Sequence, residues 1–156
     1  MDSGMVEKSR KIIADTLAHV LADTYAIYLR TQNFHWNLVG PEFYFLHILF
    51  EKQYEELAEA IDEIAERVRA LGFYVDATFS AFQKMTSLKE MDKKASKMSI
   101  KDMLQNLLEG HEQITRMLRK LSDLGEKQND PATVDLVGRR MNIHEKFAWM
   151  LRSHLA

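Results

Sequence analysis

Five candidate metal ligands of this 156-residue chain lie within one stretch, between Asn33 and Gly72. They are two imidazoles and three carboxylates: His35, His47, Glu51, Asp62 and Glu66. This mixture of nitrogen and oxygen ligands suits iron, zinc or manganese. Asp62 and Glu66 are four residues apart, as are His47 and Glu51, so each pair can face one ion from a helix. The acidic pair alone could equally be a solvated stripe, but the accompanying histidines favour a metal site.

Four of these candidate ligands would lie on one helix if residues 42–71 are helical. With about 100° of turn per residue, they form a stripe that flanks the apolar stripe and does not coincide with it. Fifteen residues separate His47 from Asp62, which is about 22 Å along a helix. No single metal centre spans that length. Two copies of the helix, antiparallel about a two-fold axis, would bring the His47 end of one to the Glu66 end of the other. The sequence therefore predicts a site shared between two copies.

The remaining histidines carry weaker signals. His35 continues the apolar stripe of the preceding helix, where a histidine bonded to a backbone carbonyl is the alternative to a metal ligand. His111 and His144 lie on apolar stripes without a carboxylate three or four residues away on their own face. Both are therefore expected to be buried and hydrogen-bonded, with no metal role. No Glu-x-x-His sequence occurs, so the usual di-iron site inside a helical bundle is not expected.

Composition limits the class of protein to which these residues can belong. The chain has no cysteine, which excludes disulfides and thiolate metal sites and is compatible with a reducing cytosol. Two prolines and six glycines, with abundant leucine, alanine, glutamate and lysine, indicate an all-α protein. The length suits one domain over residues 1–156, with residues 1–6 as a flexible tail. Neither a membrane-spanning segment nor a secretory signal is expected.

Apolar residues at helical spacing predict four long helices, and punctuating residues set their ends. Gly40-Pro41 separates the first two helices by a short connection, so these should be antiparallel. Gly72 is expected to cap the end of the second helix, Ser99 to cap the start of the third and Gly125 to close it. The expected helices span residues 7–39, 42–71, 100–124 and 131–154.

The fourth helix has the clearest start, because Asp130 can cap it and Pro131 suits the first helical position. Its expected inward side chains are Val134, Val137, Met141, Ala148, Leu151 and Leu155. The connection over residues 73–98 is too long for a tight loop and should carry a short helix near residues 80–84 as it crosses the bundle end to end. The expected fold is a ferritin-like four-helix bundle with one long crossover between helices two and three.

The stretch that holds the candidate ligands resembles the Dps family, the mini-ferritins that protect DNA in starved bacteria. The resemblance extends over the whole chain in layout, and its specific part is residues 33–72. The matching residues are Asn33-Phe34-His35-Trp36-Asn37, Gly40-Pro41, Phe43, Leu46-His47, Phe50, Asp62-Glu63-Ile64-Ala65-Glu66-Arg67 and Leu71-Gly72.

This resemblance implies a dodecameric shell built from two-fold dimers, with ferroxidase centres at the two-fold interfaces. His35, His47 and residue 51 would come from one subunit, and Asp62 and Glu66 from its partner. Such proteins oxidise Fe(II), preferring hydrogen peroxide as oxidant, and store the ferric product as an oxide core. Each site can have two iron positions. The implied role is protection of the cell and its DNA from oxidative damage, in the bacterial cytoplasm or at the nucleoid.

The chain departs from the family at Glu51, where the family usually has aspartate. Glutamate is one methylene longer and remains a good oxygen ligand, so a change in metal geometry or in the affinity of the second iron position is expected. Trp36 beside the site could donate an electron and quench radicals, with simple packing as the alternative.

Iron must also enter such a shell. In the family, acidic residues around the turn between the third and fourth long helices line three-fold pores. The candidates in this chain are Glu126, Asp130 and Asp135. Asp130 has a competing role as the cap of the fourth helix.

Direct binding to DNA is expected to be weak or absent. The formal charge of the chain is −2, so a shell of such chains should repel phosphate. Lysines near the N-terminus and between residues 84 and 101 are interleaved with acidic residues, which is typical of a solvated surface. Two alternatives to an iron-oxidising shell stay open. One is a DNA-compacting or structural shell with a vestigial iron site, and the other is a helical bundle that binds a partner through its exposed stripe.

Overall fold

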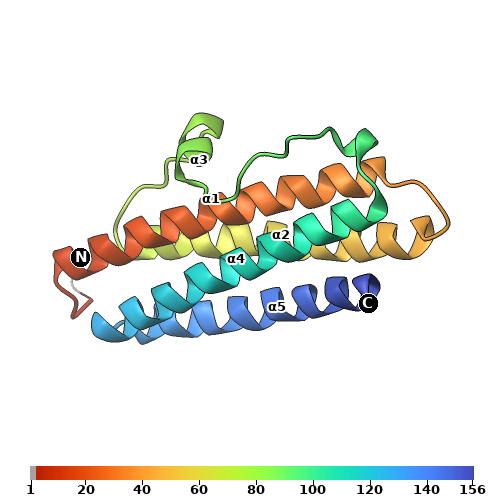
Figure 1. Ribbon diagram of the computed structural model, residues 1–156. Coiled ribbons are helices and arrows are strands. Elements are labelled where there is room, and N and C mark those ends of the chain that lie inside the picture. The colour runs from red at the N-terminus through yellow and green to blue at the C-terminus, as the bar shows by residue number, and fades with distance from the viewer. Residues whose placement is uncertain (1–2) are drawn as a thin grey trace.

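The computed structural model describes residues 3–156, which form four long helices, one short helix and a 3₁₀ turn (Figure 1). No β-strand occurs within this range. The all-α bundle and its crossover with a short helix are confirmed, while residues 1 and 2 of the predicted tail lie outside the described part. The elements are α1 (Glu7–Asn37), α2 (Phe43–Ala70), α3 (Phe79–Met85), η1 (Ala95–Lys97), α4 (Ile100–Lys127) and α5 (Pro131–Leu155).

The bundle consists of two antiparallel hairpins, α1 with α2 and α4 with α5, joined mainly by the packing of α1 on α4. The connection between the hairpins runs along the outer side of α1, carries α3, and leads to the start of α4 (Figure 1). Side chains from the four long helices form one contiguous core. Both ends of α2 stay at the ends of the bundle, so ligands carried on it remain far apart within one chain.

The first helix is long and apolar enough to cross a bilayer by length and composition alone. Its apolar side chains are instead part of the bundle core: Ile13, Leu17, Ile27 and Phe34 are among its fully buried residues. We therefore describe α1 as a core helix of the bundle.

The ends of the helices are set by the residues that the sequence indicated, with one exception. Gly72 adopts a φ of 95°, and the amides of Gly72 and Phe73 donate to the carbonyls of Arg69 and Val68, which closes α2 as a Schellman motif. Ser99 caps α4 in a capping box with Asp102.

The exception is Gly125, which was expected to close the helix that α4 forms. This prediction is wrong, since α4 continues to Lys127. Gly125 is buried inside the helix, and a Cβ atom there would lie 2.8 Å from the Cγ2 atom of Val134. The glycine therefore serves the close approach of α4 to α5, which is a property of the helix pair and not of the helix end.

The inward face of α5 was only partly predicted. Val137, Ala148 and Leu151 are buried as expected, whereas Val134, Met141 and Leu155 are half-buried. In addition α5 buries Thr133, Leu136, Arg140, His144 and Phe147. Of the three polar residues among these, His144 was expected to be buried. Hydrophobic periodicity could not reveal Thr133 and Arg140, because each needs a hydrogen-bonding partner to be stable inside.

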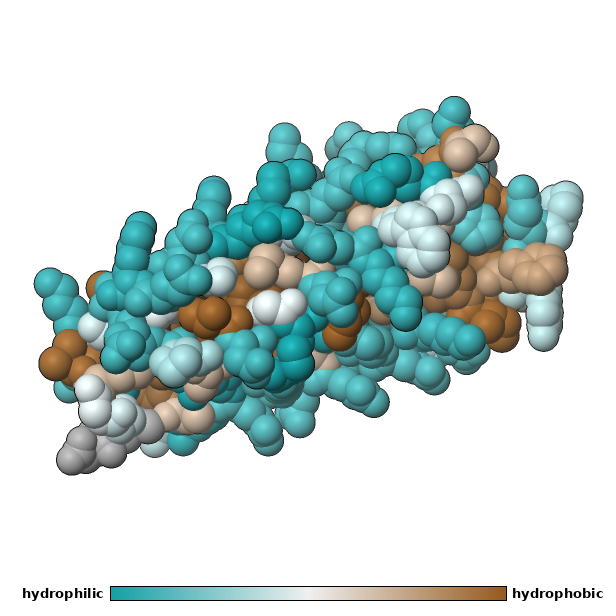
Figure 2. Space-filling view, turned by 90° about the horizontal axis from the view of Figure 1, so that it is seen from below, coloured by the Kyte–Doolittle hydropathy of each residue, from teal (hydrophilic) through white to brown (hydrophobic). Residues whose placement is uncertain are grey.

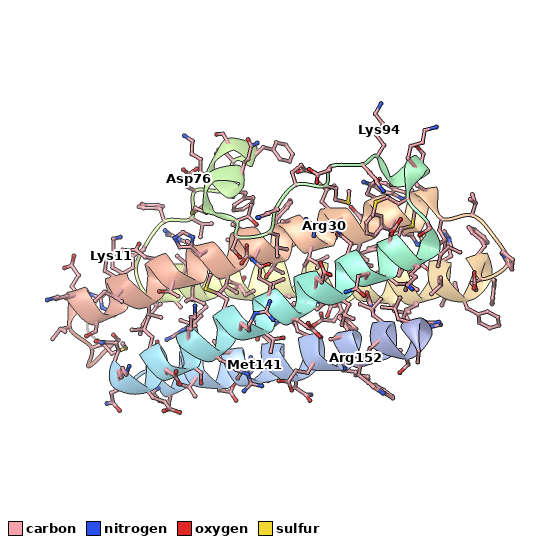
Figure 3. All side chains as sticks on the ribbon, in the orientation of Figure 1. Lys11, Arg30, Asp76, Lys94, Met141 and Arg152 are labelled. Carbon is pink, nitrogen blue, oxygen red and sulfur yellow. The ribbon has the colours of Figure 1, made fainter. Side chains whose placement is uncertain are left out.

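The crossover is hydrogen-bonded to the bundle through a fully buried carboxylate, Asp23 of α1. Its oxygens accept hydrogen bonds from the Thr86 hydroxyl at 2.8 Å, the Ser87 amide at 2.6 Å and the Ser87 hydroxyl at 2.7 Å. Arg30, also on α1, donates to the carbonyl of Lys89 at 2.6 Å. In Figure 3, Arg30 lies beside the crossover while Lys94 points away from the bundle, so the crossover has a bonded inner side and a solvated outer side.

We expect Asp23→Ala to destabilise the fold by about 2–4 kcal/mol, because three donors lose a charged acceptor at a buried position. Urea unfolding followed by circular dichroism measures the loss. Asp15→Ala is the matched control, since Asp15 is an exposed acid on the same helix and its loss should change stability by less than about 0.5 kcal/mol. Equal effects of the two substitutions would contradict the role of Asp23.

Candidate metal centre

Two of the predicted ligands, His35 and His47, lie against each other at the turn between α1 and α2. Their rings are stacked, with centroids 3.7 Å apart and planes 17° apart. The ring of Phe43 stacks on the outer side of His47 at 4.8 Å, and the edge of Tyr54 meets His35 at 5.1 Å. The short connection after α1 produces this arrangement because it returns α2 antiparallel to α1.

Each imidazole is held by the backbone of the other residue. The Nδ1 atom of His35 lies 2.9 Å from the carbonyl oxygen of His47, and the Nδ1 atom of His47 lies 3.2 Å from the carbonyl oxygen of His35. A carbonyl oxygen only accepts, so each Nδ1 carries the proton and each Nε2 keeps an available lone pair. This is the orientation that metal-binding histidines need. The hydrogen bond to a backbone carbonyl, considered as the alternative role of His35, is thus present. It uses only Nδ1, so Nε2 can still bind a metal ion.

Glu51 follows one turn after His47 on α2 and is half-buried. Burial raises the pKa of the neighbouring Tyr54, and the charges of Glu51 and Glu55 raise it further. Tyr54 therefore keeps its proton, and its ring contacts a candidate imidazole ligand. Tyr54 was not among the predicted site residues, although its spacing of three residues from Glu51 places it beside the same stripe.

The other two predicted ligands lie far from this pair. Asp62 and Glu66 are exposed in the second half of α2. Within residues 3–156, no three histidine or acidic side chains of one chain are close enough to hold a metal ion. One chain thus has two parts of a ligand set, with the imidazoles and Glu51 at one end of α2 and the two acids towards the other.

Exposed apolar side chains surround the histidine end of this set. The exposed fractions are 64% for Trp36, 79% for Val39, 69% for Tyr44 and 71% for Phe45. Figure 2 shows apolar and aromatic side chains gathered at one end of the molecule, where α1 turns into α2. Apolar surface concentrated beside a half-formed polar site is typical of a contact between proteins. Within the described residues, the indole of Trp36 has no ring contact with either histidine.

The three predicted pore residues differ in their surroundings. Asp130 is buried, accepts two bonds from Arg67 at 2.7 and 2.8 Å, and caps α5 through the amide of Thr133, which confirms its predicted capping role. Burial acts to raise the pKa of Asp130, but the hydrogen bonds from Thr133 and Arg67 outweigh it and hold the pKa below its usual value. Glu126 and Asp135 are exposed at the same turn, so these two acids have the accessibility that a pore lining requires.

His111 and His144 are buried and hydrogen-bonded, as predicted, and their partner is each other. Their Nδ1 atoms are 2.9 Å apart between α4 and α5. Burial lowers the pKa of His111 to about 3, helped by the charge of Arg140. Burial, together with His111 and Arg140, also lowers the pKa of His144 well below its ordinary value. Both rings are therefore neutral in the folded protein at neutral pH.

This pair should make the fold sensitive to acid. The unfolded chain binds protons at both histidines below about pH 6.5, whereas the folded chain does not until much lower pH. Their contribution to stability is complete above that pH and falls as pH decreases, by up to about 1.4 kcal/mol per pH unit for each group. Urea titrations at pH 7.5 and 5.0 should show this loss in the wild type and a smaller one in His111→Leu/His144→Leu. The control His19→Gln changes an exposed ring and should keep the wild-type loss of stability. A loss of the same size in His111→Leu/His144→Leu would contradict the assignment.

Comparison with known proteins gives a consistent picture. Residues 14–156 match the family model described as ferritin-like domain. The chain is 33% identical to the DNA protection during starvation protein of Helicobacter pylori, over 91% of this chain and 97% of that protein. It is 40% identical to an uncharacterized low temperature-induced protein of Nostoc, over 97% of this chain and 84% of that protein.

Solved structures agree with the sequence relatives. The crystal structure of a Dps protein from Vibrio cholerae, described as a member of a broad superfamily of ferritin-like diiron-carboxylate proteins, superposes with a TM-score of 0.91 at 29% identity, covering 97% of this chain and 94% of the other. DpsC from Streptomyces coelicolor superposes with a TM-score of 0.94 at 28% identity, covering 100% and 90%.

Proposed function

Because this chain belongs to the Dps family of the ferritin-like superfamily, we propose that it oxidises Fe(II) with hydrogen peroxide and stores the ferric product within a closed dodecameric shell of its own copies. Iron storage and protection of DNA are the roles that membership of this family supports. The peroxide chemistry and the dodecameric shell are extended to this chain from the family resemblance, and the site shared between two copies is inferred from its own residues.

The observation that carries the proposal is the pair His35 and His47, oriented by reciprocal backbone hydrogen bonds with both Nε2 atoms available. A half-formed ligand set beside an exposed apolar surface fits a site that a second copy completes. In a two-fold dimer with antiparallel α2 helices, Asp62 and Glu66 of the other copy would face these imidazoles. The two copies would then form two equivalent sites.

The residues of the shared site suit iron as a substrate. Neutral imidazole nitrogens bind Fe(II), and carboxylate oxygens favour the ferric product. Two ferrous ions each give one electron to one peroxide, which with two protons becomes two water molecules. The protein therefore needs two adjacent iron positions, and the longer side chain of Glu51 allows it to reach an ion next to the one that the histidines hold.

The test combines assembly and chemistry. Light scattering should show a closed assembly far larger than one chain. Fe(II) added without oxygen, followed by peroxide, should give rapid oxidation and a soluble ferric core. Asp62→Ala should lose the fast phase with the assembly intact, and Asp123→Ala, an exposed acid on α4, should not. A monomer, or ferric product that precipitates as it does in buffer, would refute the proposal.

Direct DNA binding by this chain is proposed to be weak at neutral pH. The crossover lysines lie on the outer side of the molecule, as Lys94 shows in Figure 3, but Glu90 and Asp92 are exposed among them. Because phosphate binding depends on net positive charge and falls steeply with salt, little retardation of plasmid is expected at physiological salt. Tight retardation under those conditions would contradict this expectation. If DNA binding is weak as proposed, DNA is protected chiefly through removal of iron and peroxide.

A further inference from the structure

A continuous row of aromatic rings leads from the candidate metal centre to the crossover. It begins where the edge of Tyr54 meets His35, with centroids 5.1 Å apart. Tyr54 meets Tyr28 at 6.3 Å, Tyr28 meets Tyr25 at 5.9 Å, and Tyr25 meets Phe82 at 4.9 Å. Every step lies within the range of direct aromatic contact. Three successive rings of this row are phenols, which are oxidised far more easily than phenylalanine.

Trp36, which the sequence suggested as a radical quencher, is not part of this row. Trp36 is 64% exposed, whereas Tyr25, Tyr28 and Tyr54 are all partly buried. The ring of Tyr54 also contacts His35 directly, and Tyr54 lies three residues after Glu51 on α2. An oxidising species formed at the metal centre would therefore meet Tyr54 at short range.

We propose that Tyr54, Tyr28 and Tyr25 form a relay that carries single oxidising equivalents away from the iron site, along the ring contacts between α2 and α1. This inference rests on the proposed function, since peroxide and Fe(II) at the site are its source of oxidant. The relay spares the imidazole ligands, which would otherwise be the nearest groups to oxidise.

The relay is needed when a site holds only one ferrous ion. That ion gives one electron to peroxide, which splits into hydroxide and a hydroxyl radical. Tyr54 gives the radical one electron and its phenolic proton, forming water and a tyrosyl radical. Tyr28 then restores Tyr54 by giving up an electron and a proton, and Tyr25 restores Tyr28 in the same way. The net change converts Fe(II) and one peroxide to a ferric ion, one hydroxide and one water molecule, and leaves one radical at Tyr25, next to Phe82 and the crossover.

The test uses the full chain with less Fe(II) than sites and an excess of peroxide. Freeze-quench electron paramagnetic resonance detects tyrosyl radicals, and peptide mapping locates oxidised residues. The wild type should give a tyrosyl signal and oxidation at Tyr25 and Tyr28. Tyr54→Phe should reduce both at least about five-fold and shift oxidation to the histidine peptides. Tyr28→Phe should keep the signal at Tyr54 and remove oxidation at Tyr25.

The control is Tyr74→Phe, because Tyr74 is 89% exposed and lies outside both the row and the apolar surface beside the histidines. It should behave as the wild type. Oxidation that follows exposure, with Tyr74 modified before Tyr25 and Tyr28, would overturn the relay. Ferric absorbance is recorded on the same samples. A normal ferric core with oxidation by exposure refutes the relay alone, and absence of a ferric core refutes the proposed function and removes the source of the relay.

Discussion

Co-expression of two inactive variants, His47→Gln and Asp62→Asn, should restore about a quarter of the wild-type rate of iron oxidation, because a two-fold dimer makes two sites from two chains. In a mixed dimer, one site combines both substitutions and the other combines the intact His47 of one chain with the intact Asp62 of the other. About half of randomly formed dimers are mixed, and each has one intact site. Each variant alone should be at least about 100-fold slower than wild type, as loss of a metal ligand implies.

The measurement is the initial rate of ferric formation per assembled chain, with the variants carrying different tags so that mixed assemblies can be purified. His35→Gln with His47→Gln is the matched control. Both substitutions lie in the same half of the site, so no mixture of these two contains an intact site. Recovery in the control, or none with His47→Gln and Asp62→Asn, would show that the two halves do not meet across a two-fold axis.

The largest expected effect on stability is that of Glu56→Ala, about 3–5 kcal/mol of unfolding free energy. Arg140 of α5 is 3% exposed and forms a two-point ion pair with Glu56 of α2, one contact of which is 3.0 Å long. Removal of Glu56 leaves a buried guanidinium beside His111 and His144, which are already held neutral partly by its charge. An unpaired buried charge is far less stable than a buried pair or an apolar replacement.

Two further variants distinguish this explanation from simple loss of a contact. Glu56→Ala/Arg140→Met removes the charge together with its partner and should recover most of the stability. Glu63→Ala removes one of the two carboxylate partners of the exposed Arg139, and an exposed pair of this kind contributes at most about 1 kcal/mol. The free energies come from urea unfolding at pH 7.5. A double variant no more stable than Glu56→Ala would show that the buried charge is not the cause.

Local sequence signals predicted most of the fold. The capping roles of Ser99 and Asp130 and the glycine at position 72 depend on backbone groups within a few residues. Such interactions join residues close together in the sequence at the start or end of one helix, so the sequence alone contains the information that they require. The number of helices and the long crossover follow from the same signals together with apolar periodicity.

Signals that depend on two helices were missed or misread. Gly125 resembles a helix end but allows close packing on Val134. Arg140 resembles a surface residue but is buried, because its partner Glu56 arrives from α2. His144 was expected to be buried, but its partner His111 lies on another helix and could not be identified from the sequence. Tyr54 lies beside the ligand stripe by its spacing from Glu51, but its contact with His35 exists only after α1 and α2 fold back on each other.

The candidate site likewise has features that the sequence predicted and features that only the structure shows. The sequence alone determined which side chains can bind iron and that α2 is too long for all of them to meet in one chain, since residue types and helical rise are local properties. Only the tertiary structure decided that His35 and His47 stack with each Nδ1 bonded to the other's carbonyl, because that geometry depends on how two helices approach each other.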